Sequence, residues 1–214
     1  MNLLFDLDGT LTDAFPGISK CISYALDRLG RRSPPKESLR RYIGPPLKNS
    51  FAALLASDDD NLAEKALRYY RERFGSVGLF ENEVYEDIPE VLEALMKMGH
   101  TLYVATSKPA VYAIRIVDHF GLHPFFKAVY GSELDGTRND KTSLITHILL
   151  NESIAPSDTV MIGDREQDMI GAKANGVRGF GVLWGYGSQN ELETSGAYTC
   201  IGHPRELFVK LSAF

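Results

Sequence analysis

The sequence predicts an α/β protein built on a doubly wound parallel sheet, which a helical segment interrupts after the first strand. Three observations support this prediction. A short apolar run at residues 3–5 indicates a buried strand. Residues 15–82 then show helical spacing without a convincing strand, and helices alternate with strands from Asp87 onward. Strands that alternate with helices form parallel βαβ units, so helices are expected on both faces of the sheet.

The inserted segment is expected to be all-helical. In "GISKCISYALDRLG" apolar residues recur at three- and four-residue steps, and Gly30 ends the run. The stretch "SPPKESLRRYIGPPLKNSFAALLA" predicts a short helix, a Gly-Pro-Pro turn and a second helix. "DNLAEKALRYYRERFG" predicts another amphipathic helix that ends at Gly75. The expected domains are therefore a core, residues 1–14 and 83–214, and an insert, residues 15–82.

The core alternates regularly after the insert. It opens with the helix "IPEVLEALMKMG", which has a proline in its first turn. The predicted strands are "HTLYVATS", "AVYGS", "DTVMIGD" and "GFGVLW". The predicted helices between them are "PAVYAIRIVDHFG", "DKTSLITHILLN" and "EQDMIGAKANG". Together with the first strand, "NLLFDLD", these segments predict one sheet.

Composition and charge exclude several classes of protein. The 214 residues are 44% hydrophobic and 24% charged, as in ordinary globular proteins. A net charge of −5 indicates no surface for a nucleic acid polymer or an anionic membrane. No apolar run approaches the roughly 20 residues that span a bilayer. The sequence shows no signal-peptide pattern, and Cys21 and Cys200 lie far apart, so we expect a cytoplasmic protein with reduced thiols. Both a monomer and a homodimer remain open.

The charge is unevenly divided between insert and core. Residues 15–82 carry 12 Lys and Arg against 8 Asp and Glu, whereas the remainder carries 11 against 20. A basic insert with an acidic core suits an anionic substrate that meets a cation held by carboxylates. A solvated basic helix surface explains the same charge equally well.

Polar and ionisable side chains stand where the predicted strands end or where the following helices begin. They are Asp6, Asp8, Gly9, Thr106, Ser107, Lys141, Asp164 and Asp168. Because the carboxyl ends of parallel strands meet at one edge of an open sheet, we expect these residues to converge. Clustered carboxylates repel one another and are costly to bury. Mg²⁺, which prefers a few carboxylates with water and a substrate phosphate, would compensate them. Its expected ligands are Asp6, Asp8, Asp164 and Asp168.

The spacing of Asp6 and Asp8 allows two separate tasks. The carboxylate of Asp6 can attack phosphorus and form an aspartyl-phosphate. Asp8 can protonate the leaving oxygen and then activate the water that hydrolyses the acyl-phosphate. Gly9 would let the chain turn sharply and approach the phosphate closely.

The remaining candidates suit phosphate oxygens, although each has a simpler explanation. The hydroxyls of Thr106 and Ser107 and the ammonium of Lys141 can bind phosphate, and a helix N-terminus near residue 108 would add backbone N–H groups. Ser107 could instead cap the helix that begins near Pro109. Lys141 could be a surface lysine, and Asp168 could be a favourable charge in the first turn of a helix.

"FDLDGTLTD", "VATSKP", Lys141 and "IGDREQD" resemble, in this order, the motifs of the haloacid dehalogenase superfamily of phosphatases. The resemblance covers nearly the whole chain and implies a Rossmann-like core with a helical cap inserted after the first strand. It also implies a role for each matching residue. Asp6 corresponds to the nucleophile and Asp8 to the acid/base. Thr106 corresponds to the phosphate-binding hydroxyl and Lys141 to the charge-balancing lysine. Asp164 corresponds to a metal carboxylate, and Asp168 corresponds to a second acidic position that binds metal directly or through water.

Within that superfamily the chain is most similar to the phosphoglycolate phosphatase and 5'-nucleotidase-like group. The similarity lies in "IGPPL" (43–47), "GSELDGTRNDK" and "VLWGYGS". Thr142 departs from the pattern, because many relatives have proline after the lysine. Gly44, Lys48 and Arg68 are the candidate substrate contacts of the cap.

The expected function is therefore a Mg²⁺-dependent phosphomonoesterase. Its substrate would be a small phosphorylated metabolite, with phosphoglycolate and 5'-nucleotides as the leading candidates. Two alternatives remain. A phosphoglucomutase-type isomerase would keep the same core and return the phosphoryl group to its substrate, and a regulatory or binding protein would use the fold without catalysis.

Overall fold

The computed structural model describes residues 1–44 and 47–211. Contacts between residues divide it into two compact units. Unit 1 comprises Met1–Thr12 and Val84–Phe214, and unit 2 comprises Asp13–Glu83. The "PP" of the predicted loop "IGPPL" and the last three residues of the predicted core lie outside the described residues.

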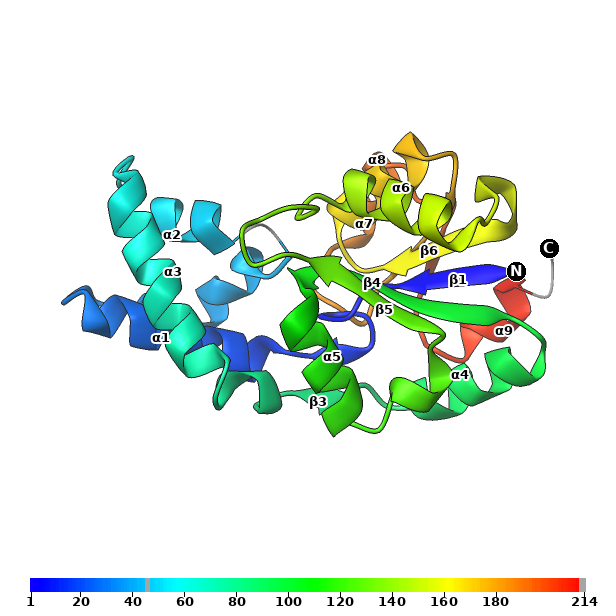
Figure 1. The fold of residues 1–214 in the computed structure, drawn as a ribbon, viewed down its shortest axis with the longest axis horizontal. Helices are drawn as coiled ribbons and strands as arrows, with labels where there is room; N and C mark the ends of the chain where they lie inside the picture. Colours follow the sequence, from blue (N-terminus) through cyan, green and yellow to red (C-terminus); the bar gives the residue numbers. More distant parts are fainter. Residues whose placement is uncertain (45–46, 212–214) are drawn as a thin grey trace. The chain divides into compact units, whose positions relative to one another are not determined.

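Unit 1 contains a parallel sheet of six strands in the order β5-β4-β1-β6-β7-β8 (Figure 1). The strands are β1 (Asn2–Phe5), β4 (Thr101–Pro109), β5 (Ala128–Ser132), β6 (Thr159–Gly163), β7 (Arg178–Val182) and β8 (Thr199–Ile201). The apolar run of β1 lies at the centre of the sheet, where Leu3 pairs with Leu102 on one side and with Val160 on the other. Leu3, like Leu4 and Phe5, is completely buried.

Helices cover both faces of this sheet (Figure 1). They are α4 (Ile88–Lys97), α5 (Ala110–His119), α6 (Lys141–Glu152) and α7 (Glu166–Ala174), followed by α8 (Gln189–Thr194) and α9 (Glu206–Leu211). Leu4 and Met161 of the sheet pack in one core cluster with Ile145 and Ile148 of α6. Phe5 points to the other face and makes an edge contact with Phe126, with 6.1 Å between ring centroids. The prediction of a doubly wound α/β fold is confirmed.

Unit 2 is helical, as its sequence predicts. It contains α1 (Phe15–Arg28), α2 (Leu47–Leu55) and α3 (Asp60–Phe74) with the 3₁₀ turns η1 (Lys36–Tyr42) and η2 (Gly78–Phe80). Its helix α1 comes very close to η2 at Gly17, where a Cβ atom would lie 2.1 Å from the carbonyl oxygen of Gly78. A glycine is needed at this contact because the neighbouring atom belongs to the backbone.

Two short strands join the units, and the sequence did not predict them. They are β2 (Thr12–Asp13) and β3 (Glu83–Val84), which form a separate two-stranded sheet. Segments of two residues are too short to show an alternating pattern. The short elements β8, α8 and α9 were not predicted for the same reason, and the 3₁₀ turns η3 (His123–Phe125) and η4 (Pro156–Asp158) complete unit 1.

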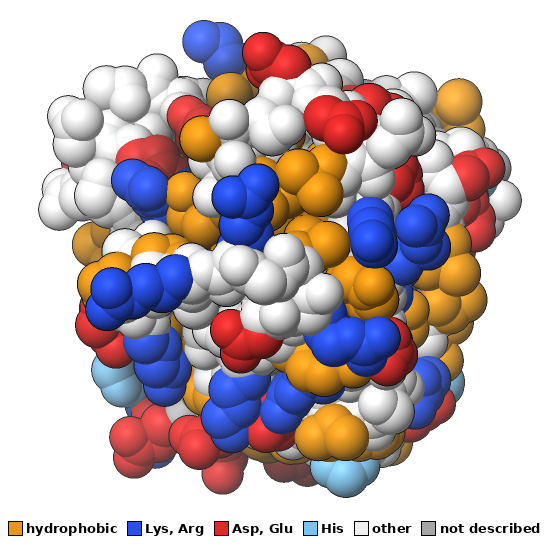
Figure 2. All heavy atoms as spheres, turned by 90° about the vertical axis from the view of Figure 1, so that its left-hand side faces the viewer, with side chains coloured by type: hydrophobic (Ala, Val, Ile, Leu, Met, Phe, Trp, Pro, Cys, Tyr) orange, Lys and Arg blue, Asp and Glu red, His pale blue; other side chains and the backbone are white. Residues whose placement is uncertain are grey.

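Basic side chains are frequent at the surface. The face drawn in Figure 2 carries many lysine and arginine side chains with acidic and apolar ones between them. In unit 2 the positive residues between α1 and α2 are exposed, including Arg31, Arg32, Lys36 and Arg41. Over the described residues, no helix has the length and apolar character needed to cross a membrane.

Candidate active site

The predicted catalytic residues of unit 1 meet at the carboxyl edge of its sheet. Asp6 follows β1, and Asp164 follows the neighbouring strand β6. Asp168 lies in the first turn of α7, and Lys141 is the first residue of α6. Since β1 and β6 are adjacent and parallel, their ends bring residues from distant parts of the chain to one place.

Lys141 links three elements through its ammonium group. Nζ donates a hydrogen bond to the carbonyl oxygen of Ala105 at 2.8 Å, and it lies 2.7 Å from Asp168 Oδ1 and 3.1 Å from Asp6 Oδ1. Only 4% of Lys141 is exposed. Burial lowers the pKa of this lysine, but the carboxylates of Asp168 and Asp6 outweigh burial and raise the pKa above its ordinary value. Lys141 therefore remains a cation, and because it is buried, the alternative that it is a surface lysine is wrong.

Three carboxylates form a buried group at this edge. One oxygen each of Asp6, Asp164 and Asp168 lies within 4.8 Å of the others. Burial raises the pKa of Asp164 well above its ordinary value, and the neighbouring carboxylates raise it further. Burial also raises the pKa of Asp168 to about 6, against the opposing effect of Lys141. Burial and mutual repulsion thus oppose the charged forms of Asp164 and Asp168, and a divalent cation with oxygen ligands would offset both effects.

The hydrogen bonding of these carboxylates also fits a cation. Within residues 1–44 and 47–211, Asp6 Oδ1 and Asp168 Oδ1 are buried without a hydrogen bond of normal geometry, and their contact with Lys141 is one of charge. Buried carboxylate oxygens normally accept hydrogen bonds. The donor set therefore suits Mg²⁺, which was expected from the sequence.

The backbone around Asp164 holds its side chain in one orientation. Oδ2 accepts a hydrogen bond from the Tyr186 amide at 2.8 Å, and Oδ1 accepts one from Thr10 Oγ1 at 3.4 Å. Gly9 has a φ of +87°, and a Cβ atom there would lie 2.2 Å from Asp164 Oδ2. Gly9 is thus required by its backbone conformation and by the carboxylate beside it.

Asp168 lies in the first turn of α7, where its sequence position also allowed a favourable helix charge. Its Oδ2 accepts a hydrogen bond from the Arg165 amide at 3.1 Å, which places the carboxylate at the N-terminus of α7. Its Oδ1 contacts Lys141. Asp168 therefore holds Lys141 and lies among the acidic residues at the same time.

Asp8 lies outside the group of three carboxylates. Its Oδ1 forms an ion pair with Lys108 Nζ at 2.7 Å, and the two side chains are 14% and 8% exposed. Burial raises the pKa of Asp8, and the attraction of Lys108 opposes that rise. Lys108 was not among the predicted site residues. Its only sequence signal is its position two residues after Thr106 in "VATSKP".

Thr106 and Ser107 lie near the end of β4. Thr106 is buried, and its Oγ1 accepts a hydrogen bond from the Lys108 amide at 3.3 Å. Ser107 is half-buried, and its carbonyl oxygen accepts a hydrogen bond from Ser132 Oγ. The suggestion that Ser107 caps the following helix is wrong, because β4 continues to Pro109 and α5 begins only at Ala110. The helix N-terminus expected near residue 108 is displaced accordingly.

The three candidate substrate contacts lie in unit 2. Gly44 is exposed with a φ of +101°, and Arg68 is exposed on α3. Lys48 pairs with Asp60 at 2.8 Å and with Glu64 at 2.9 Å. Its charge is therefore already balanced within the unit.

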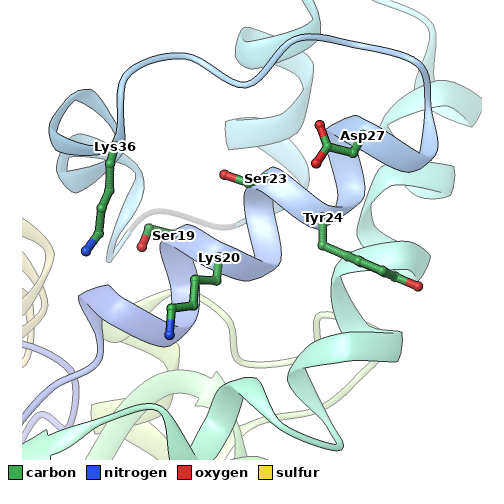
Figure 3. A pocket seen from close by; sticks show the side chains of 6 residues that line it. All are labelled: Ser19, Lys20, Ser23, Tyr24, Asp27 and Lys36. Atoms are coloured by element: carbon green, nitrogen blue, oxygen red, sulfur yellow. The ribbon is translucent and has the colours of Figure 1, made fainter.

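Unit 2 also contains an open cavity of about 340 Å³ that includes none of the predicted residues (Figure 3). It is lined by Ser19, Lys20, Ser23, Tyr24, Asp27 and Lys36. Most of its polar groups have partners in the unit: Lys20 pairs with Glu81, and the hydroxyl of Tyr24 donates to Glu72. The residues that line this cavity include no buried ionisable cluster like the one at the sheet edge of unit 1.

A doubly wound parallel sheet with a buried lysine among acidic side chains at its carboxyl edge defines a Rossmann-like α/β protein with a candidate active site at that edge. Residues 3–182 match the family described as haloacid dehalogenase-like hydrolase. The chain belongs to this family, as its motifs predicted, and it is an enzyme of the phosphatase type.

Known proteins of this family are similar over most of the chain. The 5'-nucleotidase of Pseudomonas aeruginosa is 52% identical over 191 residues, which are 89% of this chain and 86% of that protein. The tyrosine-protein kinase PtkA of Mycobacterium tuberculosis is 36% identical over 86% of this chain and 62% of its own length. A predicted phosphatase from Clostridium acetobutylicum has a similar crystal structure, with a TM-score of 0.95 and 41% identity over 100% of this chain and 98% of that one. Phosphoglycolate phosphatases of other bacteria are 24% and 28% identical.

Proposed function

We propose that this chain is a Mg²⁺-dependent phosphomonoesterase that acts on a small phosphorylated metabolite through an aspartyl-phosphate. This proposal rests on the contact of Asp6 with Lys141. Asp164 and Asp168 lie beside this contact, and Asp8, two residues after Asp6, forms its own ion pair with Lys108. A 5'-nucleotide is the first candidate substrate, since the 52% identical relative is named a 5'-nucleotidase. Phosphoglycolate is the second candidate.

In the first step Asp6 acts as the nucleophile. One of its carboxylate oxygens attacks phosphorus, the bond from phosphorus to the ester oxygen breaks, and an aspartyl-phosphate forms. Lys141 contacts Asp6 and offsets negative charge where the phosphoryl group arrives. Thr106, Ser107 and the backbone at Gly9 are the proposed phosphate contacts.

Asp8 moves the proton in both steps. It donates a proton to the departing ester oxygen, so that the alcohol leaves neutral. It then takes a proton from the water that attacks the aspartyl-phosphate, which releases phosphate and restores the Asp6 carboxylate. The burial that raises the pKa of Asp8 favours its protonated form before the first step.

The proposed ligands of Mg²⁺ are Asp6 and Asp164, with Asp168 acting directly or through water. A bound Mg²⁺ would neutralise charge on the transferring phosphoryl group. The sequence also predicts Asp8 as a ligand, and Oδ1 of its carboxylate is paired with Lys108, so proton transfer is its first proposed task. Unit 2 is the proposed cap, in which Gly44, Lys48 and Arg68 would contribute to substrate choice.

The test is phosphate release from a panel of substrates with Mg²⁺ and with chelator. The panel contains nucleoside 5'-monophosphates, phosphoglycolate, sugar phosphates and phosphotyrosine. We expect Asp6→Asn to lower kcat by about 10³-fold or more while the protein stays folded. The matched control is Asp158→Asn, since Asp158 is exposed and lies outside the site.

Each competing function gives a different result. A mutase would release no phosphate and would interconvert sugar phosphates when a sugar bisphosphate is added. A kinase would transfer label from ATP to a tyrosine peptide. A binding protein would show none of these activities. Full phosphate release by Asp6→Asn would refute the proposed nucleophile.

A further inference from the structure

The segment after β7 contacts the site at two points. The indole Nε1 of Trp184 donates a hydrogen bond to the carbonyl oxygen of Thr10 at 3.0 Å, and the amide of Tyr186 donates to Asp164 Oδ2 at 2.8 Å. The hydroxyl of Thr10 in turn donates to Asp164 Oδ1 at 3.4 Å. Both oxygens of Asp164 thus depend on groups whose positions Trp184 and its neighbours determine.

Two glycines allow this segment to lie directly against Asp164. A Cβ atom at Gly185 would be 2.3 Å from the carbonyl oxygen of Gly9 and 2.4 Å from Asp164 Cβ. A Cβ atom at Gly187 would be 2.0 Å from the carbonyl oxygen of Asp164. Because two of these neighbours are backbone atoms, no change of rotamer could make room for a side chain. The close approach is therefore built into the sequence "WGYG".

The far end of the segment is attached to the residues that follow Asp164. Glu191 Oε1 accepts hydrogen bonds from Arg165 Nε at 2.8 Å and from the Glu166 amide at 3.0 Å. Glu191 lies in the first turn of α8, whose N-cap is Ser188. The segment is thus hydrogen-bonded both to Asp164 itself and to the two residues that follow it in the chain.

We propose that Trp184, the backbone of residues 185–187 and Glu191 form a clamp that holds the carboxylate of Asp164 in the orientation that binds the cation. In this arrangement Trp184 and Glu191 are positioning residues, since neither touches the reacting atoms. Groups that orient a metal ligand commonly change metal affinity by about 10–100-fold when they are removed. The inference rests on the proposed Mg²⁺ site, because it assigns a task to the residues around one of its ligands.

The test measures Mg²⁺ binding to the complete protein by calorimetry, without substrate. Trp184→Phe keeps an aromatic ring but removes the N–H donor, and Glu191→Ala removes the acceptor at the other end of the clamp. We expect each to weaken Mg²⁺ binding about tenfold. Glu191→Gln keeps an acceptor oxygen in the same place and is expected to bind Mg²⁺ nearly as well as the unchanged protein. Tyr198→Phe is the control, because Tyr198 is 62% exposed and stacks on Phe180 away from the site.

Two further measurements separate positioning from general loss of structure. Trp184 is the one tryptophan of the sequence, so its fluorescence should change during Mg²⁺ titration of the unchanged protein and of Glu191→Ala, with the midpoint moved to higher concentration in the variant. Raising Mg²⁺ should also restore most of the kcat of Glu191→Ala. Damage confined to folding would lower the melting temperature and leave the midpoint unchanged.

The outcomes distinguish this inference from the proposed function. If the unchanged protein binds no Mg²⁺, the proposed Mg²⁺ site is wrong. If it binds Mg²⁺ and both Trp184→Phe and Glu191→Ala bind equally well, the clamp is refuted while the proposed function stands. If Trp184→Phe does not fold, the comparison of Glu191→Ala with Glu191→Gln decides.

Discussion

The ammonium group of Lys108 lies 2.7 Å from Asp8 Oδ1, although 100 positions separate the two residues in the chain. Lys108 belongs to β4 and Asp8 follows β1, and these two strands are neighbours in the sheet. Both side chains are largely buried, so water screens this attraction little. Asp8 thus has a cationic partner of its own, Lys108, and does not belong to the three-carboxylate group.

Lys108→Met should impair proton transfer by Asp8. The variant keeps the length of the side chain but removes the charge that holds the carboxylate. General acid–base catalysis contributes about 10²–10⁴-fold, and we expect a loss of about 10–100-fold in kcat with a smaller change in KM. Steady-state kinetics with the best nucleotide or alkyl phosphate of the substrate panel would measure it, because an alkoxide leaving group needs the proton. Lys127→Met is the control, since Lys127 is 57% exposed and pairs with Glu152 elsewhere. Unchanged kcat in Lys108→Met would show that the contact does not serve catalysis.

Lys141→Met should destabilise unit 1. Without the ammonium, Asp6 and Asp168 would remain as neighbouring buried carboxylates, and breaking a buried pair costs about 3–5 kcal/mol. The free energy of unfolding in urea at pH 7 without Mg²⁺ would give the cost. Lys97→Met, in an exposed pair with Glu93, should change stability by less than about 0.5 kcal/mol. Equal stability of both variants would contradict the central role of Lys141.

Gly9→Ala should remove activity because its new Cβ atom would clash with the Asp164 carboxylate. Gly99→Ala is the matched control for backbone strain alone. Gly9 and Gly99 have similar backbone angles, with φ of +87° and +84°, but only Gly9 has the Asp164 carboxylate within contact distance of a new Cβ atom. Both alanine variants should lose about 1–3 kcal/mol of stability from backbone strain. Only Gly9→Ala should lose more than about 100-fold in kcat/KM, because the new Cβ atom would displace the Asp164 carboxylate. A displacement of about 1 Å at an active site can lower the rate by that factor. Parallel melting curves and rate measurements on the two variants would show whether strain alone accounts for the loss.

Unit 2 should lose stability in acid through Glu81. Hydrogen bonds from Arg73 lower the pKa of Glu81 from 4.5 to about 2, and Lys20 adds to the effect. The pKa is lowered in the folded state, so the stabilisation is present above about pH 4.5 and is lost as the pH falls toward 2. Glu81→Gln should therefore cost about 1–2 kcal/mol at pH 7, and this difference should shrink at pH 3.

Urea unfolding of the Glu81→Gln protein and the unchanged protein at pH 7, 5 and 3 would test this. Glu37→Gln is the control, because Glu37 is 73% exposed in its pair with Arg40. A constant difference between Glu81→Gln and the unchanged protein at all three pH values would contradict the assignment.

Long segments with a clear period were predictable from the sequence. The apolar run of β1 and the helical spacing of α1 each repeat over enough residues to indicate the element, and "AVYGS" coincides with β5. The length of β4 was not predictable. It extends to Pro109 because Gly131 of β5 lets the strands approach closely, with a Cβ atom there only 2.5 Å from the carbonyl oxygen of Lys108.

The site was partly predictable, for a related reason. Lys141 and Asp164 could be placed at the site because each stands at the boundary of a predicted element, which fixes its place at the sheet edge. The partners of Lys108 and Trp184 depend on side-chain direction across strands that are distant in sequence. No periodicity along the chain contains that information.

The central place of β1 has a consequence for the order in which the chain folds. Leu3, Leu4 and Phe5 are synthesised before every other strand of the sheet, yet they need residues 102–104 on one edge and 160–162 on the other. Pairing of this kind is slow, because the entropy of closing a long loop is lost before the contacts form. Unit 2 comes from one continuous stretch and can make its contacts earlier. Until β6 leaves the ribosome, the most apolar strand of the protein keeps an open edge, and such edges recruit other chains into aggregates.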